Sequence, residues 1–234
     1  MTWTRSLLDF FYPNRCPACD AFIGAHELLC ETCADALLLA HEDYCHYCGK
    51  TICRCKQFSP AYDYAVVCSV YHEAMPAVIR LKDSTNTNFA VYAAQILASR
   101  LQLGSSYYKQ IDCVMPVPMH RTKQRMRGYN QAALIGREIA RLTDIPYRED
   151  LLTKGHSRTE QHRLSAQERA HNLDSFGIRD CDLSGMRILL CDDVLTTGNT
   201  MHRCAELLKE KGASAVIAAA AATTAPKQKE NPSF

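Results

Sequence analysis

ILLCDDVLTTGNT, residues 188–200, is the stretch of sequence that predicts the fold and a binding site together. Its apolar first half is typical of a buried strand, which would bring Asp192 and Asp193 to the carboxyl edge of a sheet, where open α/β folds bind ligands. The Thr/Gly-rich turn then opens a helix, so free amides and the positive end of the helix dipole can meet an anion. Gly198 lets the backbone close around a phosphate. The pattern favours a phosphorylated sugar, and the alternative is an ordinary strand, turn and helix.

On either side of this stretch, apolar β-rich runs alternate with amphipathic helices, which is typical of a βαβ sheet. The sequence therefore predicts an α/β domain with a mainly parallel central sheet over residues 59–234, preceded by a separate head over residues 1–58. Strands are expected at 62–71, 111–117, 186–193 and 214–223, and helices at 33–39, 88–101, 130–142 and 200–212.

Composition and charge indicate a globular protein and do not favour a membrane-spanning one. With 47% apolar residues the chain can build a real core, and its net charge of +2 does not by itself indicate a nucleic-acid partner. The longest apolar run, Ala213 to Ala222, is about half of what a membrane-spanning helix needs. The first residues carry Asp9 and Pro13 in place of a signal-peptide core. We expect a cytoplasmic protein without membrane insertion.

Eight of the thirteen cysteines lie in the head, in closely spaced pairs. The cytosol keeps thiols reduced, so metal ligation is the better interpretation than disulfides, and paired cysteines suit tetrahedral zinc. The predicted ligands are Cys16, Cys19, Cys30 and Cys33 for one structural zinc and Cys45, Cys48, Cys53 and Cys55 for a second. The short spacing within the last four leaves one or two zincs open. The head either stabilises the neighbouring domain or contacts nucleic acid or a protein partner.

Two polar segments of the α/β domain are rich in cations. Arg121, Lys123, Arg125 and Arg127 follow the expected strand at 111–117 and would concentrate positive potential where phosphates bind, unless they form a solvated loop. A long polar arm follows from Lys154 to Asn172. It is interpreted as a flexible lid whose arginines reach the ligand, or as an exposed helix. The arginines in question are Arg158, Arg163 and Arg169.

The chain resembles known families in several motifs. The strand, paired acids and T-T-G-x-T turn are similar to the phosphoribosyltransferase signature. With the paired cysteines, the P-V-P-x-H-R…R-x-R-G-Y-N-Q segment and the R-T…Q…L-S…E-R…N arm, the sequence from about Cys16 to Thr223 resembles the ComF family. It departs in the last cysteine pair, where C-x-C replaces C-x2-C.

The resemblance implies a type I phosphoribosyltransferase-like fold behind a zinc ribbon, and binding of 5-phosphoribosyl-1-pyrophosphate (PRPP) with Mg²⁺. Asp192 and Asp193 would bind the ribose hydroxyls, the loop the 5′-phosphate, and the basic segment pyrophosphate. The implied PRPP-binding residues are Asp192, Asp193, Val194, Leu195, Thr196, Thr197, Gly198, Asn199 and Thr200.

The resemblance also implies a role in natural transformation, with handling of imported single-stranded DNA in the cytoplasm. Its partners would be competence proteins such as a DNA-uptake helicase or a DNA-processing protein. If DNA binds, the basic segment is the expected contact. Two hypotheses for function follow. One is a PRPP-binding module; the other is an active phosphoribosyltransferase with an unidentified acceptor, unrelated to DNA.

Overall fold

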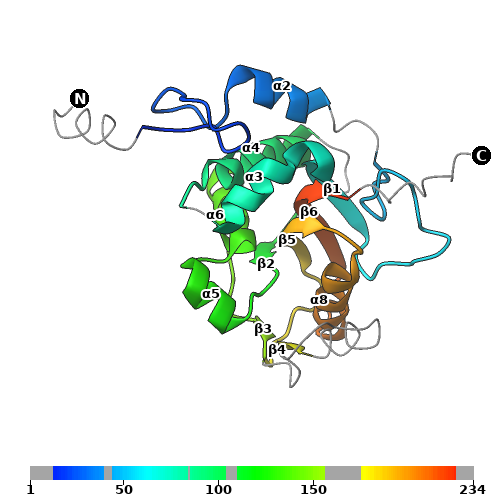
Figure 1. Ribbon diagram of the computed structural model, residues 1–234. Helices are drawn as coiled ribbons and strands as arrows, with labels where there is room; N and C mark the ends of the chain where they lie inside the picture. The colour runs from blue at the N-terminus through cyan, green and yellow to red at the C-terminus, as the bar shows by residue number, and fades with distance from the viewer. Residues whose placement is uncertain (1–12, 40–43, 84, 104–109, 156–174, 225–234) are drawn as a thin grey trace, which may run out of the picture.

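A four-stranded parallel sheet forms the centre of the described protein. The computed structural model describes residues 13–39, 44–83, 85–103, 110–155 and 175–224. The strands are β1 (Tyr64–Val70), β2 (Cys113–Pro116), β5 (Arg187–Leu195) and β6 (Ala215–Thr223), and they lie in the order β1-β6-β5-β2 (Figure 1). All three neighbouring pairs are parallel. The mainly parallel sheet that the sequence predicts is therefore confirmed.

Alternating side chains of the strands build a core on each face of the sheet. In β5, Leu189 and Cys191 pack with α3 (Tyr71–Asp83), α4 (Asn88–Leu103) and α6 (Gln131–Thr143). Ile188 and Leu190 pack with α8 (Asn199–Glu210) on the opposite face. Because both faces are covered, β6 can be apolar from Ala215 to Ala222, and all of its residues are buried.

Two helices were not expected from the sequence. One is α3, which contains Pro76. Proline has no N–H to donate to the His72 carbonyl four residues earlier, and this loss is tolerated because His72 is exposed to water. The other is α5 (Arg121–Arg127), which occupies the basic segment expected as a loop. It is fixed at both ends, since the His120 ring accepts a hydrogen bond from the Thr122 amide and Gly128 terminates the helix at φ 83°.

Smaller elements surround this domain. The strands β3 (Leu152–Lys154) and β4 (Phe176–Ile178) form an antiparallel pair beside α8 and α5. In the head, α2 (Glu31–Leu39) packs on α3 and β1, and Leu37 enters the same core as α3 and α4. No helix within the described ranges is both long and apolar enough to cross a membrane. The domain boundary at residues 58/59 stays a prediction.

Candidate ligand-binding site and cysteine clusters

A pocket of about 280 Å³ lies at the carboxyl ends of β5 and β2. It is lined from β5, the following turn and the first turn of α8 by Asp192, Asp193, Val194, Thr196 and Thr200. The opposite wall comes from the turn after β2 and the start of α6, and lysines enter from three further segments. The remaining lining residues are Lys82, Val117, Pro118, Met119, His120, Lys123, Asn130, Gln131, Ala132 and Lys154. The pocket therefore combines carboxylates, hydroxyls and cations, as a phosphorylated sugar requires.

The two carboxylates differ in their surroundings. Asp193 forms an ion pair of 2.9 Å with Lys82 at the end of α3. Asp192 accepts a hydrogen bond of 2.8 Å from the Asp193 amide, and its pKa is raised well above the usual range by desolvation first and by the Asp193 carboxylate second. Hydroxyl groups or a cation brought by a ligand would favour the ionised form of Asp192.

The turn after β5 places its residues in different environments. Thr196 and Thr200 line the pocket, while Leu195 is buried in the core. Gly198 caps α8 at φ 88°, and its backbone lies against Phe58 and Tyr62, where a Cβ atom would come within 3.3 Å of the Phe58 ring. Thr197 and Asn199 are exposed, and the Thr197 hydroxyl accepts a 3.4 Å hydrogen bond from the Asn199 amide. The positive φ of Gly198 favours glycine at this position, because other residues rarely adopt it.

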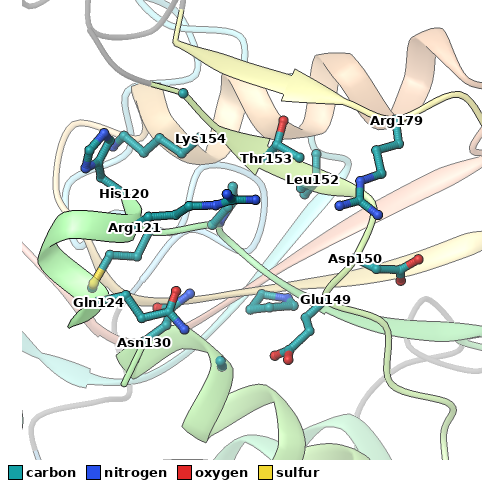
Figure 2. A pocket seen from close by; sticks show the side chains of 15 residues that line it. His120, Arg121, Gln124, Asn130, Glu149, Asp150, Leu152, Thr153, Lys154 and Arg179 are labelled. Atoms are coloured by element: carbon teal, nitrogen blue, oxygen red, sulfur yellow. The ribbon is translucent and has the colours of Figure 1, made fainter. Parts of the chain in front are cut away.

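The predicted cations of the basic segment are not all at the pocket. Lys123 lines it, and Arg121 lines an adjoining pocket of about 440 Å³ between α5 and β3 (Figure 2). Arg125 and Arg127 line neither of these two pockets. The adjoining pocket is polar at both ends: His120 and Lys154 lie at one end, and Arg179 extends toward Asp150 at the other.

The two pockets form one continuous surface. They share Pro118, Met119, His120, Asn130 and Lys154. Desolvation lowers the pKa of Lys154, and the nearby Lys123 adds to this shift. Neighbouring cations repel each other, so a bound anion would relieve the repulsion. The arginines of the predicted arm, Arg158, Arg163 and Arg169, lie outside the described residues.

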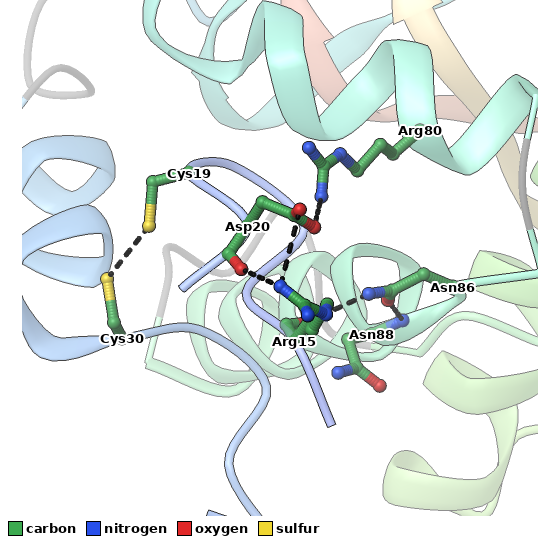
Figure 3. Close-up of polar contacts among 7 residues, drawn as sticks. All are labelled: Arg15, Cys19, Asp20, Cys30, Arg80, Asn86 and Asn88. Atoms are coloured by element: carbon green, nitrogen blue, oxygen red, sulfur yellow. Dashed lines mark hydrogen bonds and ion pairs between the residues drawn. The ribbon is translucent and has the colours of Figure 1, made fainter. Parts of the chain in front are cut away.

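The first cysteine cluster, Cys16, Cys19, Cys30 and Cys33, has its four sulfur atoms within 4.8 Å of one another. The Cys19 and Cys30 sulfurs are 3.6 Å apart, near the roughly 3.8 Å that separates two ligands placed 2.3 Å from a tetrahedral zinc. The cluster is tied to α3 and α4 by polar surface contacts (Figure 3). Asp20 pairs with both Arg15 and Arg80, and the Asn86 amide donates to the Arg15 carbonyl.

The second cluster, Cys45, Cys48, Cys53 and Cys55, has the same sulfur geometry, with the Cys45 and Cys55 sulfurs 3.7 Å apart. The thirteen cysteines are all free of disulfides. Unlike the first cluster, this one lies against the turn that follows β5: Lys50 is 6% exposed, and its ammonium donates to the carbonyls of Leu195 and Thr196. Burial lowers the pKa of Lys50 to about 8. Both clusters have the donor chemistry of a closed structural zinc site.

No sequence motif marks Lys50, Lys82, His120 or Lys154 as site residues. His120 and Lys154 lie in segments that were singled out, next to the predicted cations. Lys50 and Lys82 come from segments more than a hundred residues away from the loop they contact. Only the tertiary packing reveals them.

Comparison with known proteins gives matches over both parts of the chain. Residues 130–234 match the family described as the phosphoribosyl transferase domain, and residues 7–69 match the double zinc ribbon domain. The chain is 30% identical over 164 residues to competence protein F of Haemophilus influenzae, which covers 68% of this chain and 72% of the relative. It is 27% identical over 207 residues to DNA utilization protein YhgH of Escherichia coli K12, with 86% of each covered. Among solved structures, adenine phosphoribosyltransferase from Leishmania tarentolae aligns with a TM-score of 0.39 at 17% identity, over 63% of this chain and 74% of that one.

Proposed function

The chain belongs to the ComF family, and from this premise we propose that it binds PRPP with Mg²⁺ and handles imported single-stranded DNA in the cytoplasm during natural transformation. The fold class agrees with the sequence prediction: a type I phosphoribosyltransferase-like domain follows a zinc-ribbon head with structural zinc sites. The names of the relatives refer to competence and DNA utilization. These names support the biological setting.

In the proposed complex, each chemical group of PRPP meets a matching part of the pocket. The loop at 196–200 and the N-terminus of the twelve-residue α8 hold the 5′-phosphate. Asp192 and Asp193 accept hydrogen bonds from the ribose hydroxyls, and Lys123 with the turn after β2 holds the pyrophosphate. Mg²⁺, when bound, neutralises part of the pyrophosphate charge.

The observation that carries this proposal is that one pocket of about 280 Å³ unites a carboxylate pair, the hydroxyls of Thr196 and Thr200, and three lysines. A site with carboxylates alone would repel a phosphate, and a site for a phosphate alone would need lysines but no carboxylates. A ligand with both hydroxyl and phosphate groups satisfies the two sets at once.

Thermal unfolding with and without PRPP and Mg²⁺ tests the proposal. A ligand that binds only the native state stabilises it by about 2.7 kcal/mol at roughly a hundred times its Kd. Asp192→Ala or Asp193→Ala should remove most of the melting shift, while Thr197→Ala should reduce it less because the loop amides remain. A wild-type protein whose melting temperature does not respond to PRPP contradicts the proposal.

DNA binding is proposed for α5, on which the predicted cations gather. Arg121, Lys123 and Arg125 are exposed, and the neighbouring Met126 is 82% exposed, so the helix offers both charge and apolar surface to an unpaired strand. We therefore expect replacement of Arg121, Lys123, Arg125 and Arg127 by Ala to weaken single-stranded DNA binding and flatten its salt dependence.

The matched control for this DNA experiment replaces cations that already have carboxylate partners. Arg141 pairs with Glu138 and Arg148 with Asp150. Fluorescence anisotropy with a labelled oligonucleotide at several salt concentrations should show little change for Arg141→Ala with Arg148→Ala. Equal loss in both multiple variants would place the DNA surface elsewhere.

An active phosphoribosyltransferase is the second candidate, because the adjoining pocket of about 440 Å³ gives an acceptor a place beside the PRPP pocket. In such a reaction the protein mainly positions the two substrates and stabilises the departing pyrophosphate. Incubation of PRPP with a panel of nucleobases and nucleic acids tests it. Pyrophosphate release with one acceptor supports an enzyme; stabilisation by PRPP without release supports a binding module whose partners are competence proteins, such as a DNA-uptake helicase or DNA-processing protein.

A further inference from the structure

Lys50 joins the second cysteine cluster directly to the proposed phosphate loop, which runs from the end of β5 at Leu195 to Thr200. It is one of few charged side chains buried in the described residues, and its ammonium donates to two consecutive loop carbonyls, those of Leu195 and Thr196. Lys50 itself is held in the cysteine turn, since its carbonyl accepts a 2.8 Å hydrogen bond from the Cys45 amide. The position of the ammonium therefore depends on the turn that brings the cysteine sulfurs together.

The surrounding contacts leave little freedom between the cluster and the loop. Gly49 has φ 68°, and a Cβ atom there would come within 2.4 Å of Leu195 Cδ2. The Tyr62 hydroxyl donates to the Cys48 carbonyl at 3.0 Å. On the α8 side, the Ala61 amide donates to the His202 ring at 2.9 Å, and Phe58 lies against the same ring. The second cluster and the segment after it thus form the outer wall of the loop.

Lys50 can act on the loop in two ways, by orienting its peptide groups and by its charge. In a trans peptide the carbonyl and the following N–H point in opposite directions, so a carbonyl held toward Lys50 directs the next amide away from it. Holding the Thr196 carbonyl in this way orients the Thr197 amide, and removes two oxygen atoms from the side where an anion would bind. The ammonium also adds a buried positive charge behind the loop, where the low dielectric strengthens its attraction for a phosphate.

The two carbonyls also accept hydrogen bonds from other groups, so Lys50 can be replaced without leaving them unpaired. The Thr223 and Thr224 hydroxyls donate to the Leu195 and Thr196 carbonyls at 3.3 and 3.1 Å. Removal of the lysine therefore leaves both oxygens hydrogen-bonded, and its main consequence should fall on the loop's conformation and charge.

We propose that Lys50 is a positioning residue of the phosphate loop, through which the second zinc cluster supports ligand binding. This inference rests on the proposed PRPP site and specifies which part of the head that site depends on. The first cluster has no equivalent residue among the described contacts, since the polar contacts beside it reach Arg80, Asn86 and Asn88, none of which lines the pocket.

The test compares two probes that bind different ends of the site. Ribose 5-phosphate reports on the loop at 196–200, and inorganic pyrophosphate reports on the turn after β2. Calorimetry on the full chain with Lys50→Met should show ribose 5-phosphate affinity reduced about ten- to hundredfold, the range expected for hydrogen bonds to a charged group. Pyrophosphate affinity and zinc content should match wild type. Lys56→Met, an exposed lysine of the same cluster, is the control and should bind both probes normally.

Three outcomes would overturn the inference. Unchanged ribose 5-phosphate affinity in folded Lys50→Met removes the role assigned to this residue and leaves the PRPP proposal standing. Equal loss of both probes shows a general structural defect. Wild-type protein that binds neither probe overturns the proposed function together with this inference. If Lys50→Met does not fold, Lys50→Gln, which keeps a donor and removes the charge, is measured by the same criteria.

Discussion

The two cysteine clusters have the same sulfur geometry and opposite relations to the ligand pocket. In the first, Cys16 is buried in the core shared with α3 and α4, and the polar contacts to the α/β domain run through the Arg15–Asp20–Arg80 group and asparagine side chains, away from the ligand pocket. In the second, a buried lysine and a glycine at φ 68° lie against the loop that follows β5. On the proposed function, the first site would mainly stabilise the fold and the second would also shape the loop that binds the ligand.

Sequence alone cannot draw this distinction, because the same thiolate pairs create both sites. Zinc supplies folding free energy wherever it closes such a turn. What differs is a residue placed between the cysteines: Lys50, two residues after Cys48, faces the loop, whereas Asp20, directly after Cys19, pairs with arginines at the surface. The two sites should therefore differ in their effect on ligand binding.

The largest expected difference is between Cys53→Ser and Cys19→Ser, which change one exposed ligand in each cluster. Elemental analysis should show loss of about one zinc per chain in both variants, because serine is a poor ligand for a structural tetrahedral site. Only Cys53→Ser should lose the PRPP-dependent melting shift. Retained binding in Cys53→Ser with zinc absent, or lost binding in folded Cys19→Ser, would contradict the difference proposed between the clusters.

A smaller effect is expected for Asp192→Asn, which weakens a proposed ligand contact and leaves the second zinc cluster against the loop. Asp192→Asn preserves an oxygen acceptor for the Asp193 amide and removes the charge. The melting shift of several degrees with PRPP and Mg²⁺ should largely disappear, while zinc content and cluster structure remain. This variant therefore shows the effect of losing a ligand contact while the zinc cluster that supports the loop stays intact.

The pH dependence of the same variant without ligand follows from the raised pKa of Asp192. As pH rises from the unfolded pKa toward the higher folded pKa, the unfolded chain releases the proton more readily, so stability declines, and the penalty is complete above the folded pKa. Asp192→Asn removes this penalty. Its melting temperature should exceed that of wild type by an amount that grows between the unfolded and the folded pKa and levels off above the folded pKa, and a difference that does not grow within this range would contradict the assignment.

The sequence predicted those parts of the molecule that depend on local pattern. The apolar run before Asp192 becomes β5, and the helix expected at 130–142 becomes α6 at Gln131–Thr143. The paired cysteines come together as two sets of four. In each case the decisive interactions join residues close in sequence, or repeat with the period of a helix or strand.

Other parts could not be predicted because they depend on distant segments or on end effects. The basic segment is helical since His120 and Gly128 fix its two ends, although its interior has no apolar face. Lys82 and Lys50 are ordinary lysines in sequence, and only folding brings them to Asp193 and to the loop carbonyls. The roles of the individual loop residues stay predictions until ligand binding is measured.

The smallest expected effect concerns α3, the helix that both regions share. Arg80 on this helix pairs with Asp20 of the first cluster, and Lys82, two residues later, pairs with Asp193 in the pocket. The Arg80 pair lies at the surface, where such pairs contribute about 0–1 kcal/mol, so Arg80→Ala should lower the free energy of unfolding by no more than that. PRPP affinity should not change, because the carbonyl of Leu81 remains held by Tyr129 at 2.8 Å and by Gln131 at 3.3 Å, which keeps the end of α3 at the pocket. Chemical denaturation and calorimetry on Arg80→Ala measure both quantities. Weakened PRPP binding in this variant would show that the first cluster also acts on the pocket, through α3, and that the two clusters differ in degree and not in kind.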